Sequence, residues 1–356
     1  MRLCALSRFA AGACCAAALA FGASTMESGK ASLKSAGALA IGPDGVLFVG
    51  DSMGGAIFAL DVNDHAAAKS AGNLEITGIN EKIAAMLGTT ADQIAINDVV
   101  VNPASKNVYI SASRGKGTNA APVILRVDPA GKIGEVSLDN IKHSSVSLPD
   151  RPTEDRQRMD TITSIKYVSG QVLVAGLSNE EFSSSLRSIP YPFQQYSKAA
   201  GIEIYHGSHG RFETNAPVRT FVPYEIGNQQ SILAAYTCTP LVKIPVSDLK
   251  PGNKVKGTTI AELGNGNRPL DMIVYAKGGK HFILMANSSR GVMKLTADNL
   301  ESYSAITAHT EVAGVPYETI ASLKGVQQLD KLDDANALVL ISGANGALDL
   351  RAVPLP

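Results

Sequence analysis

The sequence predicts an all-β protein, a β-propeller of six blades, and three observations support this prediction. A short apolar segment recurs about every 60 residues, as expected when one structural unit is repeated. Each copy follows a turn rich in Gly, Asn, Asp or Ser, the residues that tight hairpins favour. The flanking segments are short apolar runs or apolar–polar alternations, which is the pattern of strands.

The recurring segment is interpreted as the second strand of each blade. The clearest unit covers residues 39–62, where two strands flank the turn Gly42-Pro43-Asp44-Gly45 and a third strand follows. The second strands are expected at VLFV from Val46, VYIS from Val108, VLVA from Val172, ILAA from Ile232, FILM from Phe282 and LVLI from Leu338. First strands are expected at ALAI, DVVV, SIKY and DMIV, and third strands at AIFALDV, PVILRVD, IEIY, PLVKIPV, GVMKL and GALDLRA.

The number of blades follows from the spacing. Six units fill the chain, and seven blades are the alternative if an enlarged loop hides a degenerate unit. Two separate β-sandwich domains are a further alternative, but no linker or change of composition divides the sequence. Residues 79–95 carry apolar side chains at helical spacing, which predicts a short helical insert between the first two blades.

The N-terminus has the pattern of an export signal. Arg2 and Arg8 precede an uncharged, Ala-rich run that ends in small residues, so residues 1–24 are predicted to be a signal peptide and 25–356 a single propeller domain. We therefore expect a periplasmic or secreted protein. No other stretch is apolar enough for a transmembrane segment. Basic and acidic side chains balance at 32 each, which gives no reason to expect nucleic acid as a partner.

The long loops are expected on one face of the propeller, the face of the second-to-third strand connections and blade crossings. Residues 112–121, 143–161, 178–201 and 206–218 form these loops, and long loops in compact domains commonly carry function. The 178–201 segment is rich in aromatic residues, which suits recognition, although the same rings could pack the loop onto the blades. The candidate ligand-binding residues are Arg114, Asn179, Arg187, Tyr191, Phe193, Arg268 and Arg290.

Oxygen-bearing side chains at the strand ends suggest a cation site facing the central channel. The candidate metal ligands are Asp51, Asn97, Asp98 and Asn287, and Ca²⁺ or another divalent cation is the ion that such ligands would bind. The alternative is that these residues serve turn chemistry by bonding to their own backbone. No cofactor is otherwise predicted.

A second metal hypothesis concerns His206 and His209 in the sequence YHGSHG. Their spacing allows a shared metal, with Cys238 or His281 as a third ligand brought close by the fold. The alternative is that both histidines are ordinary turn residues. Cys238 is the single cysteine outside the predicted signal and is otherwise expected to be a small buried apolar residue.

The unit LAIGPDGVLFVGD resembles blades of NHL and SMP-30/gluconolactonase propellers. That resemblance implies a metal-dependent, lactonase-like or esterase-like hydrolase, with Asp51, Asn97 and Asn287 matching its Asp and Asn ligand types. The other hypothesis is a non-catalytic module that binds a small molecule or an extracytoplasmic protein through its loop-rich face and central funnel. No phosphate loop, dinucleotide fingerprint, nucleophile elbow or H-E-x-x-H motif is present. Whether the protein is an enzyme stays open at this stage.

Overall fold

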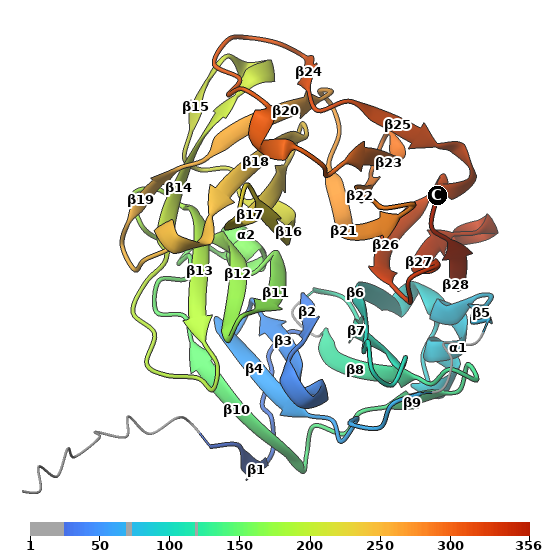
Figure 1. The fold of residues 1–356 in the computed structure, drawn as a ribbon. Helices are drawn as coiled ribbons and strands as arrows, with labels where there is room; N and C mark the ends of the chain where they lie inside the picture. Colours follow the sequence, from blue (N-terminus) through green and yellow to red (C-terminus); the bar gives the residue numbers. More distant parts are fainter. Residues whose placement is uncertain (1–24, 69–72, 118–119) are drawn as a thin grey trace, which may run out of the picture.

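The computed structural model describes residues 25–68, 73–117 and 120–356. Six β-sheets are arranged around a central channel, as Figure 1 shows, so the prediction of a six-bladed β-propeller is confirmed. The predicted signal peptide, residues 1–24, lies outside the described residues. Within the described residues, no helix is long and apolar enough to span a membrane.

The inner and second strands of the six blades follow one another along the chain. The inner strands, which surround the channel, are β2 Leu39–Ile41, β6 Ile94–Val101, β11 Ser164–Val168, β16 Val218–Ile226, β21 Pro269–Lys277 and β26 Val326–Lys331. The second strands are β3 Leu47–Asp51, β7 Val108–Arg114, β12 Gln171–Leu177, β17 Gln229–Tyr236, β22 Lys280–Asn287 and β27 Asn336–Ser342. All six predicted second strands are therefore confirmed. We number the blades 1 to 6 in this chain order.

Two further layers of strands complete the blades. The third strands are β4 Ala56–Asp61, β8 Ala121–Val127, β13 Ser184–Pro190, β18 Pro240–Pro245, β23 Gly291–Thr296 and β28 Leu348–Pro354. The outer strands of blades 1 to 6 are, in that order, β10 Ile141–Ser147, β9 Ile133–Glu135, β14 Ala200–His206, β20 Thr258–Leu263, β25 Tyr317–Ile320 and β5 Glu75–Ile76. Short additional strands extend three of the sheets: β1 Glu27–Gly29, β15 Arg211–Glu213, β19 Lys254–Lys256 and β24 Val312–Gly314.

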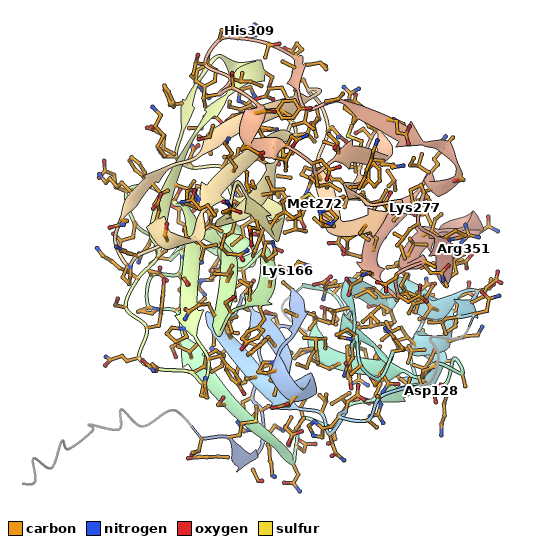
Figure 2. The ribbon with its side chains drawn as sticks, viewed as in Figure 1. Asp128, Lys166, Met272, Lys277, His309 and Arg351 are labelled. Atoms are coloured by element: carbon orange, nitrogen blue, oxygen red, sulfur yellow. The ribbon has the colours of Figure 1, made fainter. Side chains whose placement is uncertain are left out.

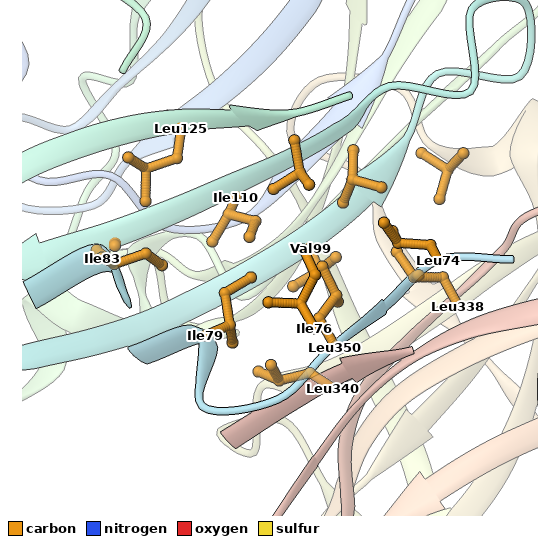
Figure 3. Packing of buried hydrophobic residues seen from close by; sticks show 14 of the residues in the cluster. Leu74, Ile76, Ile79, Ile83, Val99, Ile110, Leu125, Leu338, Leu340 and Leu350 are labelled. Carbon is orange, nitrogen blue, oxygen red and sulfur yellow. The ribbon is translucent and has the colours of Figure 1, made fainter. Parts of the chain in front are cut away.

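The predicted helical insert is present as α1 (Ile79–Met86), followed by the 3-10 turn η2 (Ala91–Gln93). Its apolar face is buried, with Ile79 and Ile83 fully inaccessible to solvent. Figure 3 shows these residues in the cluster that includes Ile110 of blade 2 and Leu350 of blade 6. The helix therefore fills the space between two blades. The other helical turns are α2 Asp155–Arg158, η1 Pro43–Gly45, η4 Met159–Thr161, η5 Gly207–His209, η6 Val246–Asp248, η7 Leu300–Ser302, η8 Ala321–Leu323 and η9 Ala344–Gly346.

The order of the blades around the channel differs from their order in the chain. The inner strand β2 of blade 1 contacts both β6 and β11, whereas β6 also contacts β26 (Figure 1). Blade 2 therefore lies between blades 6 and 1. The chain returns from blade 2 along the outside of blade 1, where β10 pairs with β4, before it enters blade 3. The passage between blades 1 and 2 also supplies β5, which pairs with β28 and completes blade 6.

The segment 178–201 is not the long loop that the sequence suggested. It contains the third strand β13, which pairs along its whole length with β12, and IEIY belongs to the outer strand β14 instead. The aromatic residues that follow β13 pack inward: Phe193 is 2% exposed, and its ring centroid lies 6.0 Å from that of Phe48. Tyr191 packs edge-on against Phe48 at 4.9 Å. The rings therefore anchor this segment to the core of blades 1 and 3.

Arg187 lies in β13 and not in a surface loop, so its predicted location is wrong. Its guanidinium is completely buried and bonds to Asp150 Oδ1 at 3.3 Å. It also donates to the carbonyl oxygens of Thr161 and Leu177, at 3.1 and 2.9 Å. Asp150 accepts two more hydrogen bonds, from Tyr196 Oη and the Ala199 amide. This network joins the crossing before blade 3 to the blade itself.

Substitution of Arg187 tests this structural role. Arg187→Gln leaves Asp150 as a buried charge without its counter-ion, which costs about 3–5 kcal/mol of unfolding free energy. Urea denaturation followed by circular dichroism measures the change. Arg126→Gln, at an exposed position of β8, is the control and should change stability by less than about 0.5 kcal/mol. Unchanged stability of Arg187→Gln would contradict the assignment.

Candidate functional site

The strongest candidate site is the channel mouth on the face where the inner strands begin. Four inner strands have a β-bulge near their start, which leaves one residue of each, Asn97, Arg219, Leu270 and Gln327, out of the pairing with the second strands. A bulge turns the extra residue away from its ordinary direction. Three of the four bulge residues, Asn97, Arg219 and Leu270, line one cavity of about 320 Å³. Backbone irregularity therefore places polar and charged side chains at the channel mouth.

The lining of this mouth cavity is mostly polar. Side-chain hydroxyls and amides come from blades 1, 2, 3 and 6, and two arginines come from blades 4 and 5. The lining residues are Ser35, Ala36, Gly37, Ala38, Ser52, Asn97, Ser113, Met159, Asp160, Ile162, Thr163, Arg219, Arg268, Pro269, Leu270 and Gln328. Several of them, including Asn97, Thr163 and Arg219, also line a smaller cavity of about 60 Å³ that contains Lys166. The mouth thus continues into the channel.

Charged side chains from four inner strands meet in the channel. Lys166 of β11 faces Asp98 of β6, Asp271 of β21 and Asp330 of β26, and Figure 2 shows Lys166 at the centre of the ring. Within the described residues, no carboxylate lies within 4.0 Å of its ammonium. Gln328 lies beside two of these carboxylates, and its amide nitrogen donates to Asp271 Oδ2 at 3.1 Å and Asp98 Oδ1 at 3.3 Å when it faces them.

One ammonium cannot balance three enclosed carboxylates, and the pKa values reflect this. Burial raises the pKa of Asp98 to about 6 and that of Asp271 to about 7, and the negative charges nearby add to the effect. Burial also raises the pKa of Asp330. For Lys166 burial opposes the charge, but attraction by the three carboxylates outweighs it and raises the pKa. The channel therefore holds a fixed cation among partly protonated acids near neutral pH.

At the rim of the mouth positive side chains outnumber negative ones, whereas in the channel carboxylates outnumber the single ammonium. Arg219 pairs with Asp160 at 2.8 Å and donates to Thr237 Oγ1 at 3.2 Å. Arg268 is exposed, and among the residues that the structure describes it has no ion pair and its guanidinium has no hydrogen bond. Partial burial lowers the pKa of Arg268, as does repulsion from Arg219, while Asp160 raises it. Arg268 is therefore a charged donor whose hydrogen bonds are available to a ligand.

A wider groove adjoins the mouth on the same face. It measures about 820 Å³, lies over blades 5 and 6, and shares Leu270 and Gln328 with the mouth cavity. Its lining includes Arg290 and Lys324 and no acidic side chain. Arg290 donates to the carbonyl oxygen of Asn265 at 2.9 Å. The mouth and the groove together form a continuous depression with four cationic side chains and one carboxylate, that of Asp160.

The structure separates the ligand-binding candidates of the sequence into three groups. Arg268 and Arg290 line the depression just described. Arg114 and Asn179 are exposed at strand ends but line none of these cavities. Tyr191, Phe193 and Arg187 pack in the interior, as described above.

The predicted metal ligands do not share a single environment. Asp51 accepts hydrogen bonds from the backbone amides of Lys34, Ser35 and Gly54 and from the Ser35 hydroxyl, so its oxygens are occupied. Asn287 lines the groove and bonds to Asn267. Only Asn97 and Asp98 line the channel cavities. The four residues share no hydrogen-bond partner.

Two channel residues that the sequence reasoning missed have a recognisable signal. Lys166 interrupts the otherwise apolar strand SIKYV, and Arg219 follows a buried valine at the start of VRTFV. Lys166 and Arg219 both line the channel cavities, where a charged side chain of an inner strand can be accommodated.

One group of His, Cys, Asp and Glu side chains in the described residues is close enough to hold a metal ion. It consists of His206, His209 and Cys238, with one potential ligand atom from each residue within 4.8 Å of the others. This group lies at the loop-rich ends of blades 3 and 4.

Comparisons with known proteins show only distant similarity to solved structures. No family model and no curated protein sequence matches the chain. A putative oxidoreductase (glucose dehydrogenase) from Thermus thermophilus is 11% identical, with 92% of this chain and 100% of that chain covered and a TM-score of 0.37. The PQQ-bound aldose sugar dehydrogenase of Streptomyces coelicolor is also 11% identical, with 93% and 98% covered and a TM-score of 0.37. Streptogramin B lyase is 10% identical, with 93% and 97% covered and a TM-score of 0.34. Likeness at this level does not extend to activity.

The channel carboxylates make stability depend on pH. The native state keeps protons on Asp98 and Asp271 up to about pH 6–7, whereas aspartates in the unfolded chain lose them near about pH 3.9. Unfolding free energy should therefore fall as pH rises between these values. Asp271→Asn removes one titrating group and should reduce the fall between about pH 5 and pH 8 by on the order of 2 kcal/mol. Urea denaturation at several pH values measures it.

The exposed Asp139→Asn is the matched control and should keep the pH dependence of the unaltered protein. Stability that rises with pH over this interval, or the same pH dependence in Asp271→Asn, would contradict the interpretation.

Proposed function

We propose that this protein binds a small anionic molecule at the mouth of its central channel. The observation that carries the proposal is Arg268, an exposed guanidinium at the mouth without an acidic partner among the described residues, next to Arg219. A guanidinium presents several donors in a planar fork that matches a carboxylate or phosphate. An anion between the two arginines would also relieve their mutual repulsion.

The remaining lining suits a ligand with hydroxyl groups. Asn97 and Gln328 supply amides, and Ser113 and Thr163 supply hydroxyls, to a cavity of about 320 Å³. Pockets that hold small molecules commonly start at about this size. The adjoining groove, with Arg290 and Lys324, offers space for a longer anionic ligand. Together with the predicted export signal, these features support a ligand-binding propeller that acts outside the cytoplasm.

The hydrolase hypothesis has less support. A metal-dependent site of the lactonase kind needs several oxygen ligands around one position. Asp51 already accepts four hydrogen bonds from the protein, and Asn287 lines the groove over blades 5 and 6. Within the channel, Lys166 lies among the carboxylates where a cation would bind. We therefore propose binding and no hydrolysis at this site.

Isothermal titration with defined probes tests the proposal. Gluconate represents the carboxylates, glucose 6-phosphate the phosphate esters and glucose the neutral sugars. At least one anion should bind and glucose should not, and the affinity should fall with added salt. Arg268→Gln should weaken the binding about 10- to 100-fold, the loss expected for hydrogen bonds to a charged group.

Arg126→Gln is the matched control, because Arg126 is exposed on β8 and lies outside the cavity lining. It should leave the affinity unchanged. Binding of glucose as tight as that of the anions, or an affinity that Arg268→Gln does not change, would overturn the proposal.

A further inference from the structure

Two histidines and the cysteine come together where blades 3 and 4 meet. His206 ends β14, His209 ends the turn η5, and Cys238 lies in the turn between β17 and β18. One nitrogen from each imidazole and the Cys238 sulfur lie within 4.8 Å of one another. We infer that these three residues form a zinc site. The inference is independent of the proposed anion site, because none of the three residues lines the channel mouth.

Glu213 orients both imidazoles toward a common ligand. Its Oε2 lies 2.8 Å from His206 Nδ1, and its Oε1 lies 2.8 Å from His209 Nδ1. An ionised carboxylate only accepts hydrogen bonds, so each Nδ1 must be the protonated nitrogen. The Nε2 atoms then carry free lone pairs. A carboxylate behind a histidine is the usual support of a metal-binding imidazole.

The free nitrogen of His206 lacks a partner in the protein. His206 is 2% exposed, and its Nε2 is buried without a hydrogen bond among the described residues. The two imidazole centroids are only 3.8 Å apart, with the rings tilted by 37°. A buried acceptor without a partner costs free energy of about 1–3 kcal/mol. A cation shared by the two Nε2 atoms would satisfy it.

Cys238 occupies a backbone conformation that turn chemistry alone does not favour. Cys238 and Thr239 have φ values of 64° and 60°, in the left-handed region that Gly and Asn adopt most readily. Each such residue costs on the order of 1–3 kcal/mol. The turn nevertheless has a thiol where glycine would be less strained. The thiol is free and partly exposed, which keeps it accessible to a metal ion.

The chemical types of the three ligand atoms favour zinc over other metal ions. Two imidazoles and one thiolate are ligands of zinc, with distances of about 2.0–2.1 Å to nitrogen and about 2.3 Å to sulfur. A tetrahedral site needs its ligand atoms closer than 4.8 Å, so the exposed His209 and the partly exposed Cys238 would have to move toward the ion. The thiolate and Glu213 supply two negative charges near the ion, and the Arg211 guanidinium, 3.1 Å from Glu213 Oε1, adds one positive charge at the edge of the site. A water molecule would serve as the fourth ligand of such a site.

Metal uptake by the purified protein tests the inference. After dialysis with chelator and reloading, elemental analysis should find one zinc per chain. Co²⁺ in place of zinc should give the visible bands of a tetrahedral site and a thiolate-to-cobalt charge-transfer band. Cys238→Ser should abolish the charge-transfer band, and His209→Ala should weaken zinc binding by more than about 100-fold. Glu213→Gln should weaken it about 10- to 100-fold.

His281→Ala is the matched control, because His281 bonds to Tyr224 and lies outside the cluster. It should leave zinc binding unchanged. Zinc should also slow the alkylation of Cys238 by iodoacetamide in the unaltered protein, a measurement that needs no variant. The inference is overturned if no stoichiometric zinc binds, if the alkylation rate is unaffected, or if only copper binds and the cobalt derivative lacks the thiolate band.

Discussion

The ring is held at its centre by aspartates that bond across the boundary between blades. Each of three aspartates accepts a hydrogen bond from a backbone amide of the neighbouring blade. Asp98 accepts from the Leu39 amide at 2.7 Å. Asp271 accepts from the Leu329 amide at 2.9 Å, and Asp330 accepts from the Val101 amide at 2.7 Å. In each case the other oxygen bonds to the amide of the next residue on its own strand. The three bridges join blades 2 to 1, 5 to 6 and 6 to 2. On the opposite side, the Thr163 hydroxyl bonds to the Val218 carbonyl between blades 3 and 4.

These bridges explain why the channel carries its charges. Each of these carboxylates accepts backbone amides from two strands and lies in the channel near the carboxylates of other blades. Lys166 offsets part of their charge, and the proton that Asp271 keeps to about pH 7 offsets more. Arg219, the bulge residue of β16, and Arg268, which directly precedes β21, both line the mouth above the acidic channel. The proposed anion site depends on this arrangement, with positive side chains at the rim and carboxylates deeper in the channel.

Local patterns in the sequence were sufficient to predict the repeated strands, but they could not predict how distant segments pair with one another. The second strands are apolar and follow turn residues, and all six were predicted. Strand β13 was missed because Ser184, Ser185 and Arg187 read as a polar loop, although all three are buried. The charge of Arg187 is satisfied by Asp150, far away in the chain, and no local pattern reveals such a pair. The return of the chain past blade 1 likewise depends on pairing between β10 and β4, which the spacing of repeats does not encode.

The His206–His209 spacing was visible in the sequence, but its third ligand was specified only by the packing of blades 3 and 4. The same packing connects this cluster to the channel mouth. Arg219 donates to Thr237, and Thr237 precedes Cys238 in a turn whose backbone is strained. Because Thr237 and Cys238 are adjacent in the chain, this turn physically links the His206–His209–Cys238 cluster to Arg219 at the channel mouth.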